Sequence, residues 1–549
     1  MKTNPALEFN NEFLFNSMFA QKTLYISTTL PYINSNPHIG HAFEFVLSDF
    51  FKRYYNLIKC KINSPYSLFI GNFAGFDDDE HNCILNTGVD EHGQKVYQSA
   101  LAKGKDPQEY CDNACLYWKE FCELIYMSYD IFYRTTSDDH KRFSQEFLFN
   151  IRNILYQKEY KGKYCIGCES FKTEKEIKNK RCEFHPSVEL QEISENNFFF
   201  PLSNFKKIDI ENILVDKSLL SELRNIIENC SDLSISRERV SWGIPIPFSN
   251  QTIYVWFEAL LNYVFATGYN PDLLNFSDFS EKWKNSLIIC GKDNLKFQAF
   301  ILPAILKSQG IKPPSKILVH GMILDERGNK MSKSEGNVID PINQIGKFGI
   351  GAFRYYLLSG INTFQNSSYS EEELINKYNN DLSNNLGNLI SRVTSIIEKE
   401  PEFFHSEIEG HDFLKKPENK MFELIKGIKN KNSSFISYSS AEIKKAHEEI
   451  QVNLNVKNAF TILNNLVTQT NKYFTIKKPY DKLLPFEERR NCIVEMLYII
   501  KELYYFYAAA TPNIQNQYLS IFRSEKISKT ILYKKLEKEP ELEEKTFKI

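Results

Sequence analysis

Long apolar runs are missing from this sequence. Across its 549 residues no stretch approaches the roughly 20 apolar residues that a helix needs to cross a bilayer. The N-terminus also lacks the basic-then-apolar pattern of a secretion signal. Neither sign of charge is in excess, because the formal net charge is only −2. Any binding of nucleic acid would therefore depend on local basic surface and not on the charge of the whole chain. These absences predict a soluble, cytoplasmic globular protein without membrane contact.

The length and the cysteines set two further limits. A chain of 549 residues is too long for one hydrophobic core, so two to four domains are expected. Eleven cysteines are an odd number in a chain without a secretion signal, which favours a reducing compartment with free or metal-bound thiols. Residues 1–22 contain no arginine and make a poor transit peptide, so they are expected to form a loosely held extension.

The first candidate site lies between Thr23 and His41. The pattern over 23–27 predicts a strand, and the apolar positions after His41 predict a helix. A loop between a strand and a helix N-terminus is where α/β proteins hold anions, because the first helical N–H groups are unpaired. His38 and His41 could both donate to phosphate oxygens, and Gly40 leaves room for a flat ring. The alternative is an ordinary turn with two surface histidines.

A second loop follows at Thr87–Lys95. A strand that ends in glycine and is followed by carboxylates suits an active-site loop at the carboxyl edge of a parallel sheet. Asp90 could hold a substrate ammonium group there, or it could be the N-cap of the helix expected from Lys95 onward. The acidic run at 77–80 is typical of a solvated loop, and a metal site is the less favoured alternative.

Two residue pairs have the spacing of a metal knuckle. They are Cys165-x2-Cys168 and, after thirteen residues, Cys182-x2-His185. Two ligands in one turn can reach the same tetrahedral ion, and three thiolates with one imidazole fill all four positions of zinc. The pattern predicts one structural Zn²⁺, or a closely similar metal, with no position open for water. The alternative is a knuckle that has lost its metal and keeps its fold by packing.

Trp256, Ala259 and Tyr263 are spaced to share one face of a helix that follows a strand near Ile253. They could be ordinary core residues, or they could form the apolar wall of a pocket with one hydroxyl group. The pocket becomes the better interpretation if the two earlier loops converge on this helix.

Two later loops carry charges that suit a nucleotide. Asp293 follows Gly291 at another strand–turn–helix junction and could accept ribose hydroxyl protons. Lys330 and Lys333 lie three residues apart on a loop with Ser and Gly, which could close on pyrophosphate as a mobile cationic clamp.

From about Glu371 onward the sequence predicts an all-α region. The expected helices are 374–398, 417–431, 439–452, 456–476 and 486–509. The tail at 524–549 is rich in Lys and Glu with little apolar face, which predicts a solvated helix or partial disorder.

Taken in order, these motifs resemble those of the methionyl-tRNA synthetases, a family of class I aminoacyl-tRNA synthetases. The matching segments are Leu30-Pro31-Tyr32, His38-Ile39-Gly40-His41, Asp90-Glu91-His92-Gly93, the Cys3His knuckle, Tyr254-Val255-Trp256, Gly291-Lys292-Asp293 and Lys330-Met331-Ser332-Lys333-Ser334. The resemblance covers the chain from about residue 22 to about residue 515.

The resemblance implies an α/β fold: a Rossmann-type class I synthetase catalytic domain with an inserted zinc-knuckle connective domain, followed by an all-α anticodon-binding domain. The implied divisions are the extension 1–22, the first catalytic half 23–142, the connective insertion 143–250, the second catalytic half 251–325, the KMSKS loop and stem-contact region 326–370, the helical domain 371–523 and the charged tail 524–549.

It also implies a role for each site residue. The residues implied for catalysis are His38, His41, Lys330 and Lys333; ATP would be bound by these four together with Gly40, Gly291 and Asp293. The residues implied for methionine are Leu30, Tyr32, Asp90, Trp256, Ala259, Tyr263 and Gln298, and those for the anticodon are Asn388, Arg392 and Tyr480.

The implied reaction is activation of L-methionine by ATP, with Mg²⁺, and transfer of the methionyl group to tRNA(Met) for initiation and elongation of translation. One alternative is a catalytically altered, synthetase-like protein that only binds tRNA. A nucleotidyltransferase that shares the histidine motif is another, but such proteins are small and lack both the knuckle and the helical region.

Several positions depart from the family pattern. Tyr480 stands where the family usually has Trp, Gln298 where it has His and Glu258 where it has Asp, and the acidic stretch 72–82 looks like an insertion. None of these changes removes a catalytic residue. The chain also stops without an appended tRNA-binding or dimerisation domain, so a monomer is expected.

Overall fold

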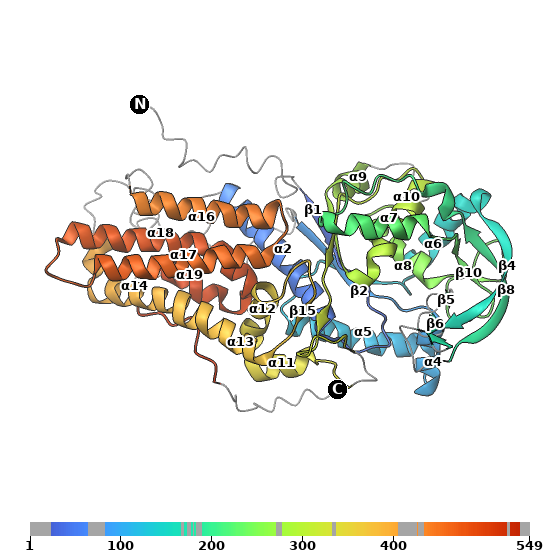
Figure 1. Ribbon diagram of the computed structural model, residues 1–549, viewed down its shortest axis with the longest axis horizontal. Helices are drawn as coiled ribbons and strands as arrows, with labels where there is room; N and C mark the ends of the chain where they lie inside the picture. Colours follow the sequence, from blue (N-terminus) through green and yellow to red (C-terminus); the bar gives the residue numbers. More distant parts are fainter. Residues whose placement is uncertain are drawn as a thin grey trace.

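A five-stranded parallel β-sheet lies at the centre of the molecule (Figure 1). The computed structural model describes residues 23–63, 83–165, 170–172, 177–178, 180–182, 189–270, 277–331, 336–404, 425, 433–523 and 527–537. The sheet has the strand order β13-β12-β1-β2-β3. Its strands are β1 (Leu24–Ser27), β2 (Cys83–Val89), β3 (Ile131–Arg134), β12 (Ser286–Gly291) and β13 (Lys316–His320).

The strand order determines where a ligand can bind. The strand order reverses at β1, because β2 and β3 extend the sheet on one side of β1 and β12 and β13 extend it on the other. In parallel α/β sheets, ligands bind outside the carboxyl ends of the strands at such a reversal. The expected strands at 23–27, before Gly291 and before Gly321 are therefore present, and their ends meet at one edge.

Helices cover both faces of this sheet, as the continuous burial of β1 and β12 requires. The longest is α2, which turns the apolar side chains Phe43, Val46, Leu47 and Phe50 into the core. The helices of this part are α2 (Ile39–Asn63), α4 (Gln94–Ala102), α5 (Pro107–Leu124), α6 (Asp138–Ile151), α8 (Val255–Phe265), α9 (Ser277–Lys284) and α10 (Leu302–Ser308), with 3-10 turns at Lys292–Asn294 and Arg152–Ile154 and a π-helical turn at Phe297–Ile301.

A small antiparallel sheet lies at the right-hand end of Figure 1. Its order is β5-β4-β8-β9, and two short ribbons, β6–β7 and β10–β11, lie near it in the chain. The elements are β4 (Tyr156–Cys165), β5 (Ser170–Lys172), β6 (Ile177–Lys178), β7 (Arg181–Cys182), β8 (Gln191–Phe200), β9 (Leu233–Ser234), β10 (Ser236–Arg237), β11 (Thr252–Ile253) and α7 (Leu220–Glu228), with 3-10 turns at Leu202–Phe205 and Lys217–Leu219.

The chain after the parallel sheet is mainly helical and occupies the left-hand half of Figure 1. Its elements are β14 (Ile323–Leu324), α11 (Pro341–Phe348), α12 (Ile350–Ser359), β15 (Ser367–Ser368), α13 (Glu371–Lys377), a π-helical segment (Tyr378–Gly387), α14 (Asn388–Lys399), a 3-10 turn (Pro401–Phe404), α16 (Ser434–Gln451), α17 (Val456–Lys477), α18 (Phe486–Ala510), a 3-10 turn (Pro512–Ile514) and α19 (Gln515–Arg523). The parallel-sheet α/β core and the helical C-terminal region are thus both confirmed.

Two details of the helix predictions need comment. The helix expected from residue 439 begins earlier, because the Ser433 side chain accepts a hydrogen bond from the Ile436 N–H and caps the helix there. The helix expected at 417–431 lies outside the described residues except for Ile425.

A buried arginine joins the helical region to α2, which packs on the parallel sheet. Arg354 of α12 is 0% exposed and donates to Asp49 of α2 at 2.7 Å. It also donates to the carbonyl oxygens of Ile125, Ala509 and Ala510. The same α2 that begins at the His38–His41 loop is therefore tied to the C-terminal end of α18.

The prediction for the C-terminal tail is wrong for its described part. Residues 527–537 form no helix and pack against the helical region. Tyr533 is 4% exposed and Leu532 6% exposed, and Leu536 exchanges two backbone–side-chain hydrogen bonds with Asn379 at 2.8 and 2.9 Å. A few buried apolar side chains and the two hydrogen bonds to Asn379 hold the segment, although it has no regular secondary structure.

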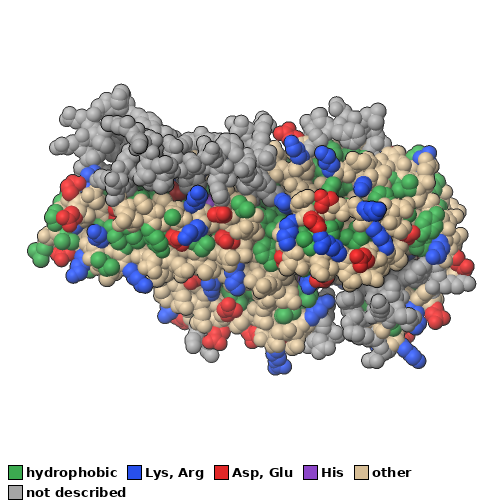
Figure 2. Space-filling model, turned by 45° about the horizontal axis from the view of Figure 1, so that its top comes forward, with side chains coloured by type: hydrophobic (Ala, Val, Ile, Leu, Met, Phe, Trp, Pro, Cys, Tyr) green, Lys and Arg blue, Asp and Glu red, His purple; other side chains and the backbone are tan. Residues whose placement is uncertain are grey.

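The surface agrees with the near-zero net charge. Lys and Arg side chains are interspersed with Asp and Glu side chains over the described part of the face in Figure 2. Within the described ranges, no helix combines the length and the apolar character needed to span a membrane.

Candidate functional site

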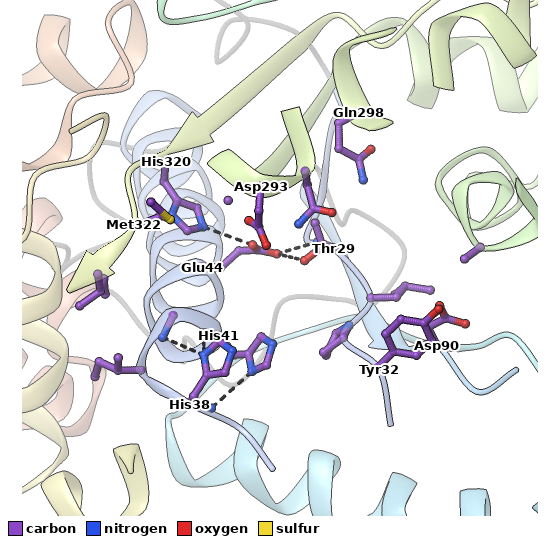
Figure 3. A pocket seen from close by; sticks show the side chains of 18 of the residues that line it. Thr29, Tyr32, His38, His41, Glu44, Asp90, Asp293, Gln298, His320 and Met322 are labelled. Carbon is purple, nitrogen blue, oxygen red and sulfur yellow. Dashed lines mark hydrogen bonds and ion pairs between the residues drawn. The ribbon is translucent and has the colours of Figure 1, made fainter. Parts of the chain in front are cut away.

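One pocket of about 340 Å³ opens at the carboxyl edge of the parallel sheet, where β1, β12 and β13 end (Figure 3). It collects residues from five separated parts of the sequence. The predicted residues that line it are Leu30, Tyr32, His38, Gly40, His41, Asp90, Trp256, Ala259, Tyr263, Gly291, Asp293, Gln298 and Lys330. Every predicted ATP or methionine residue among the described ones is in this set, whereas Lys333 lies outside the described residues.

The two histidines at the start of α2 form one unit. Their rings stack with centroids 3.6 Å apart. Nδ1 of His38 accepts from the backbone N–H of Gly40 at 3.1 Å, and Nδ1 of His41 accepts from the backbone N–H of His38 at 3.3 Å. A neutral ring that accepts at Nδ1 carries its proton on Nε2. Each ring therefore presents an Nε2–H donor at the N-terminal end of α2, which suits an anionic ligand.

Asp293 and Gly291 lie together after β12. A Cβ atom on Gly291 would come within 2.7 Å of Asp293 Oδ1, so a glycine is needed for the carboxylate to lie there. Lys330 also lines the pocket, from the loop after β14. The side of the pocket beside the histidines thus combines a carboxylate with a cation from a separate loop.

Glu44 and His320 also line the pocket, and the sequence predictions missed both. Oε1 of Glu44 accepts from the backbone N–H of Thr29 at 2.7 Å and from its hydroxyl at 2.6 Å, while Oε2 lies 3.3 Å from Nε2 of His320. Nδ1 of His320 donates to the carbonyl oxygen of Gly321 at 2.8 Å. Burial alone would lower the pKa of His320, but Glu44 outweighs it and raises the pKa, which favours an ion pair on the pocket wall.

The sequence held a signal for each missed residue. Glu44 lies four residues after Gly40 and so falls on the same helix face. His320 is the last residue of β13, where the carboxyl ends of parallel strands meet.

Asp90 faces the pocket and is 5% exposed. Its backbone is fixed against the first loop, because its N–H donates to Pro31 at 2.9 Å and its carbonyl accepts from Ile33 at 3.0 Å. The N-cap of α4 is Gly93, without a side-chain cap, so the alternative in which Asp90 caps this helix is excluded. The two loops that carry Tyr32 and Asp90 do converge, as Figure 3 shows.

The wall opposite these loops comes from α8 and the π-helical turn. The Trp256 ring stacks on Phe297 at 4.2 Å between centroids and meets Tyr32 edge-on at 6.1 Å. The Tyr263 hydroxyl accepts a hydrogen bond from Nε2 of Gln298 at 2.7 Å. Burial raises the pKa of Tyr263 well above its ordinary value, so the hydroxyl keeps its proton as a donor. This wall can therefore hold an apolar chain with one weakly polar atom.

Two of the four predicted zinc ligands fall within the described chain. Cys165 ends β4, Cys182 ends β7, and they are 0% and 1% exposed. Cys168 and His185 lie outside the described residues. Among the described residues no cluster of three or more His, Cys, Asp or Glu side chains could hold a metal. Two buried thiols at strand ends fit the donor set of structural zinc, and the site remains a prediction.

The three predicted anticodon residues lie on α14 and after α17. Asn388 is exposed at the start of α14. The Arg392 guanidinium lies 4.1 Å from the Phe474 ring centroid and donates to the Thr475 hydroxyl at 3.2 Å. The half-exposed Tyr480 ring lies 6.2 Å from the same phenylalanine. These side chains offer a cation and an aromatic face near one another.

Comparison with known proteins agrees with this geometry. The family described as tRNA synthetases class I (M) matches residues 24–64, 77–187 and 176–394. The methionine–tRNA ligase of Fusobacterium nucleatum is 36% identical over 391 residues, which cover 69% of this chain and 58% of that protein. The methionine–tRNA ligase of Nostoc sp. is 31% identical over 513 residues, which cover 90% of this chain and 89% of that protein.

A solved structure is similar over nearly the whole chain. Mycobacterium tuberculosis methionyl-tRNA synthetase in complex with methionyl-adenylate has a TM-score of 0.75 and 25% identity, and the match covers 93% of this chain and 98% of that one. The chain therefore belongs to the family of class I tRNA synthetases that includes the methionine–tRNA ligases.

Proposed function

We propose that this protein activates L-methionine with ATP to form methionyl-adenylate and then transfers the methionyl group to tRNA(Met). The observation that carries the proposal is the pocket at the carboxyl edge of the sheet. Two stacked histidines and Lys330 line it together with Asp90 and the aromatic wall of α8. A reaction between an amino acid and a nucleotide needs both ligands in one cavity, because positioning supplies much of the rate.

The phosphates of ATP would lie at the histidine pair. The methionine carboxylate attacks the α-phosphorus in line, and pyrophosphate leaves. The Nε2–H groups of His38 and His41 would donate to the α-phosphate oxygens as charge develops on them, and Lys330 and Lys333 would close over the β- and γ-phosphates. Mg²⁺ would enter with ATP and neutralise phosphate charge. Asp293 would accept from the ribose hydroxyls, with Gly40 facing the adenine.

Methionine would lie between Asp90 and α8. The Asp90 carboxylate would accept from the substrate ammonium group, and Leu30, Tyr32, Trp256 and Ala259 would surround the side chain. Because the Tyr263 oxygen already accepts from Gln298, its own proton is left to point toward the thioether sulfur. Thioether sulfur is only a weak acceptor, so shape would supply most of the discrimination, about 1–3 kcal/mol per methylene.

The insertion and the helical region would serve tRNA. We propose that 143–250 is a connective domain whose knuckle, Cys165, Cys168, Cys182 and His185, holds one structural zinc. Bound zinc would crosslink the knuckle and take no part in the reaction. We also propose that 371–523 reads the anticodon: Asn388 and Arg392 would bond to base edges and Tyr480 would stack on a base. The protein would act as a monomer.

Amino-acid-dependent exchange of pyrophosphate into ATP tests the proposal. The full chain is expected to catalyse exchange with L-methionine and to give no more than background with the other standard amino acids. Exchange with a different amino acid alone would refute the methionine assignment. Charging of tRNA(Met) then separates the enzyme from the alternative, a synthetase-like tRNA-binding protein, which would bind tRNA without aminoacylating it.

A further inference from the structure

Glu258 is a buried carboxylate beside the methionine side of the pocket that the proposed reaction does not use. It lies on α8 between the pocket residues Trp256 and Ala259, but it is not among the pocket-lining residues and is 0% exposed. A buried charge is unfavourable unless it is paired, so its partners indicate what it holds in place.

Each oxygen of Glu258 contacts a different histidine ring. Oε1 lies 2.9 Å from Nδ1 of His92, and Oε2 lies 2.5 Å from Nε2 of His140. The second ring nitrogen of His140, Nδ1, lies 2.9 Å from the Tyr133 hydroxyl. Burial alone would raise the pKa of Glu258, but the two histidines outweigh it and hold the pKa below its ordinary value. Since a carboxylate can only accept, both facing nitrogens are donors.

This cluster joins the two sides of the methionine site. His92 belongs to the loop of Asp90, whereas Glu258 belongs to the helix that carries the aromatic wall. The residue between Asp90 and His92 points elsewhere: Glu91 accepts from Nε of Arg134 at 2.9 Å, at the end of β3. The loop is thus anchored to β3 through Glu91 and to α8 through His92, and the His92–Glu258 contact is a direct link from the loop to α8.

The geometry points to Glu258 as a positioning residue for the amino-acid half of the pocket. By holding His92, it sets the separation between Asp90 and the α8 wall, and so between the points that take the ammonium group and the side chain of the substrate. This inference rests on the proposed function, in which those two points bind methionine.

The substitution Glu258→Gln tests this at almost constant volume. Glutamine offers one acceptor oxygen and one N–H₂ donor, so one of the two histidine N–H groups would face another donor. That ring must turn, lose its bond or move its proton to its other nitrogen, and the charged contact that holds the Asp90 loop against α8 is lost in each case. Small displacements of a positioning group have large effects on binding and rate. The histidine pair and Asp293 lie outside the cluster, so ATP binding is expected to remain.

A second buried, paired carboxylate provides the control. Glu502 is 1% exposed and pairs with Lys61 at 2.6 Å and with Lys501 at 3.2 Å, between α2 and α18. In pyrophosphate exchange by the full chain, Glu258→Gln is expected to raise the methionine KM about ten-fold or more, with the ATP KM within about two-fold. Glu502→Gln is expected to leave both KM values unchanged, even if it lowers the melting temperature.

An unchanged methionine KM in Glu258→Gln, or an equal rise in Glu502→Gln, would overturn the inference. If Glu258→Gln fails to fold, the pair His92→Asn and His92→Leu replaces it. The amide nitrogen of Asn can stand where Nδ1 stood and is expected to restore a near-normal methionine KM, whereas Leu is expected to raise it. Equal values for Asn and Leu would contradict the inference. A wild-type protein without methionine-dependent exchange would overturn the proposed function and this inference together.

Discussion

Removing the charge of Asp90 is expected to weaken methionine binding and to leave ATP binding intact. The substitution Asp90→Asn keeps the shape of the side chain. It also keeps the backbone bonds to Pro31 and Ile33, 2.9 and 3.0 Å long, that fix the loop. What it removes is the negative partner for an ammonium group at a site only 5% exposed to water.

The burial of Asp90 sets the size of the expected loss of methionine binding. A hydrogen bond to a charged group contributes about 1.5–3 kcal/mol. At about 1.36 kcal/mol for each factor of ten, the methionine KM should rise roughly 10- to 150-fold. Solvent screening should be weak inside the pocket, so raising the salt concentration should not abolish the difference.

Steady-state pyrophosphate exchange measures both KM values, and Asp293→Asn is the matched comparison. The two aspartates lie on different sides of one pocket (Figure 3), and Asp293 is assigned to the ribose. Asp293→Asn should raise the ATP KM about five-fold or more and leave the methionine KM unchanged. A rise in the ATP KM for Asp90→Asn would refute the assignment of Asp90 to methionine. An Asp90→Asn protein with unchanged KM values for both methionine and ATP would refute it as well.

Three further predictions concern the metal, the tRNA and the core. Elemental analysis should find about one zinc per chain in the wild type and less in Cys165→Ser. A fully active, metal-free wild type would contradict the proposal that the knuckle binds structural zinc. Tyr480→Ala should weaken tRNA binding by about 1–3 kcal/mol in a filter assay without changing pyrophosphate exchange, and unchanged binding would exclude stacking by this ring. Arg354→Met should lower the free energy of unfolding in urea by about 3–5 kcal/mol, because it leaves Asp49 buried without this partner. Burial opposes ionisation of Asp49, but Arg53 and Arg354 hold its pKa at about 2, below the ordinary 3.8. The stability contributed by Asp49 is therefore present above pH 3.8 and is lost as the pH falls toward 2. Without Arg354 the folded-state pKa of Asp49 lies closer to 3.8, so in Arg354→Met this acid-dependent loss should be smaller and should end at a higher pH. An acid profile identical to that of the wild type would contradict this role.

The pocket residues that could be predicted from the sequence are those that directly follow a strand. His38, Asp90 and Asp293 each follow an apolar strand, and the carboxyl ends of parallel strands must meet at one edge. The convergence of residues about 250 positions apart follows from that rule together with the strand order. Glu44 and His320 each lie at a position that could have indicated the pocket, but their role depends on the contact between them, which only the folded chain shows.

Other features depend on tertiary contacts that local patterns do not contain. Gln298 lies in a π-helical turn, which no periodicity over Phe297–Ile301 indicates. The segment 527–537 is charged enough to resemble a solvated helix, yet Tyr533 and Asn379 hold it against the helical region. The cluster around Glu258 joins α8, the Asp90 loop and α6, which only the folded chain brings together.

A crystal structure of the full chain with a non-hydrolysable analogue of methionyl-adenylate would show whether the one pocket holds both substrates of the first step. We expect the ammonium group within hydrogen-bond distance of Asp90, the thioether beside the Tyr263 hydroxyl, the ribose at Asp293 and the phosphate at the stacked histidines. An analogue bound with its amino-acid part away from Asp90 and α8, or with its phosphate away from His38 and His41, would contradict the claim that this one pocket carries out the first step.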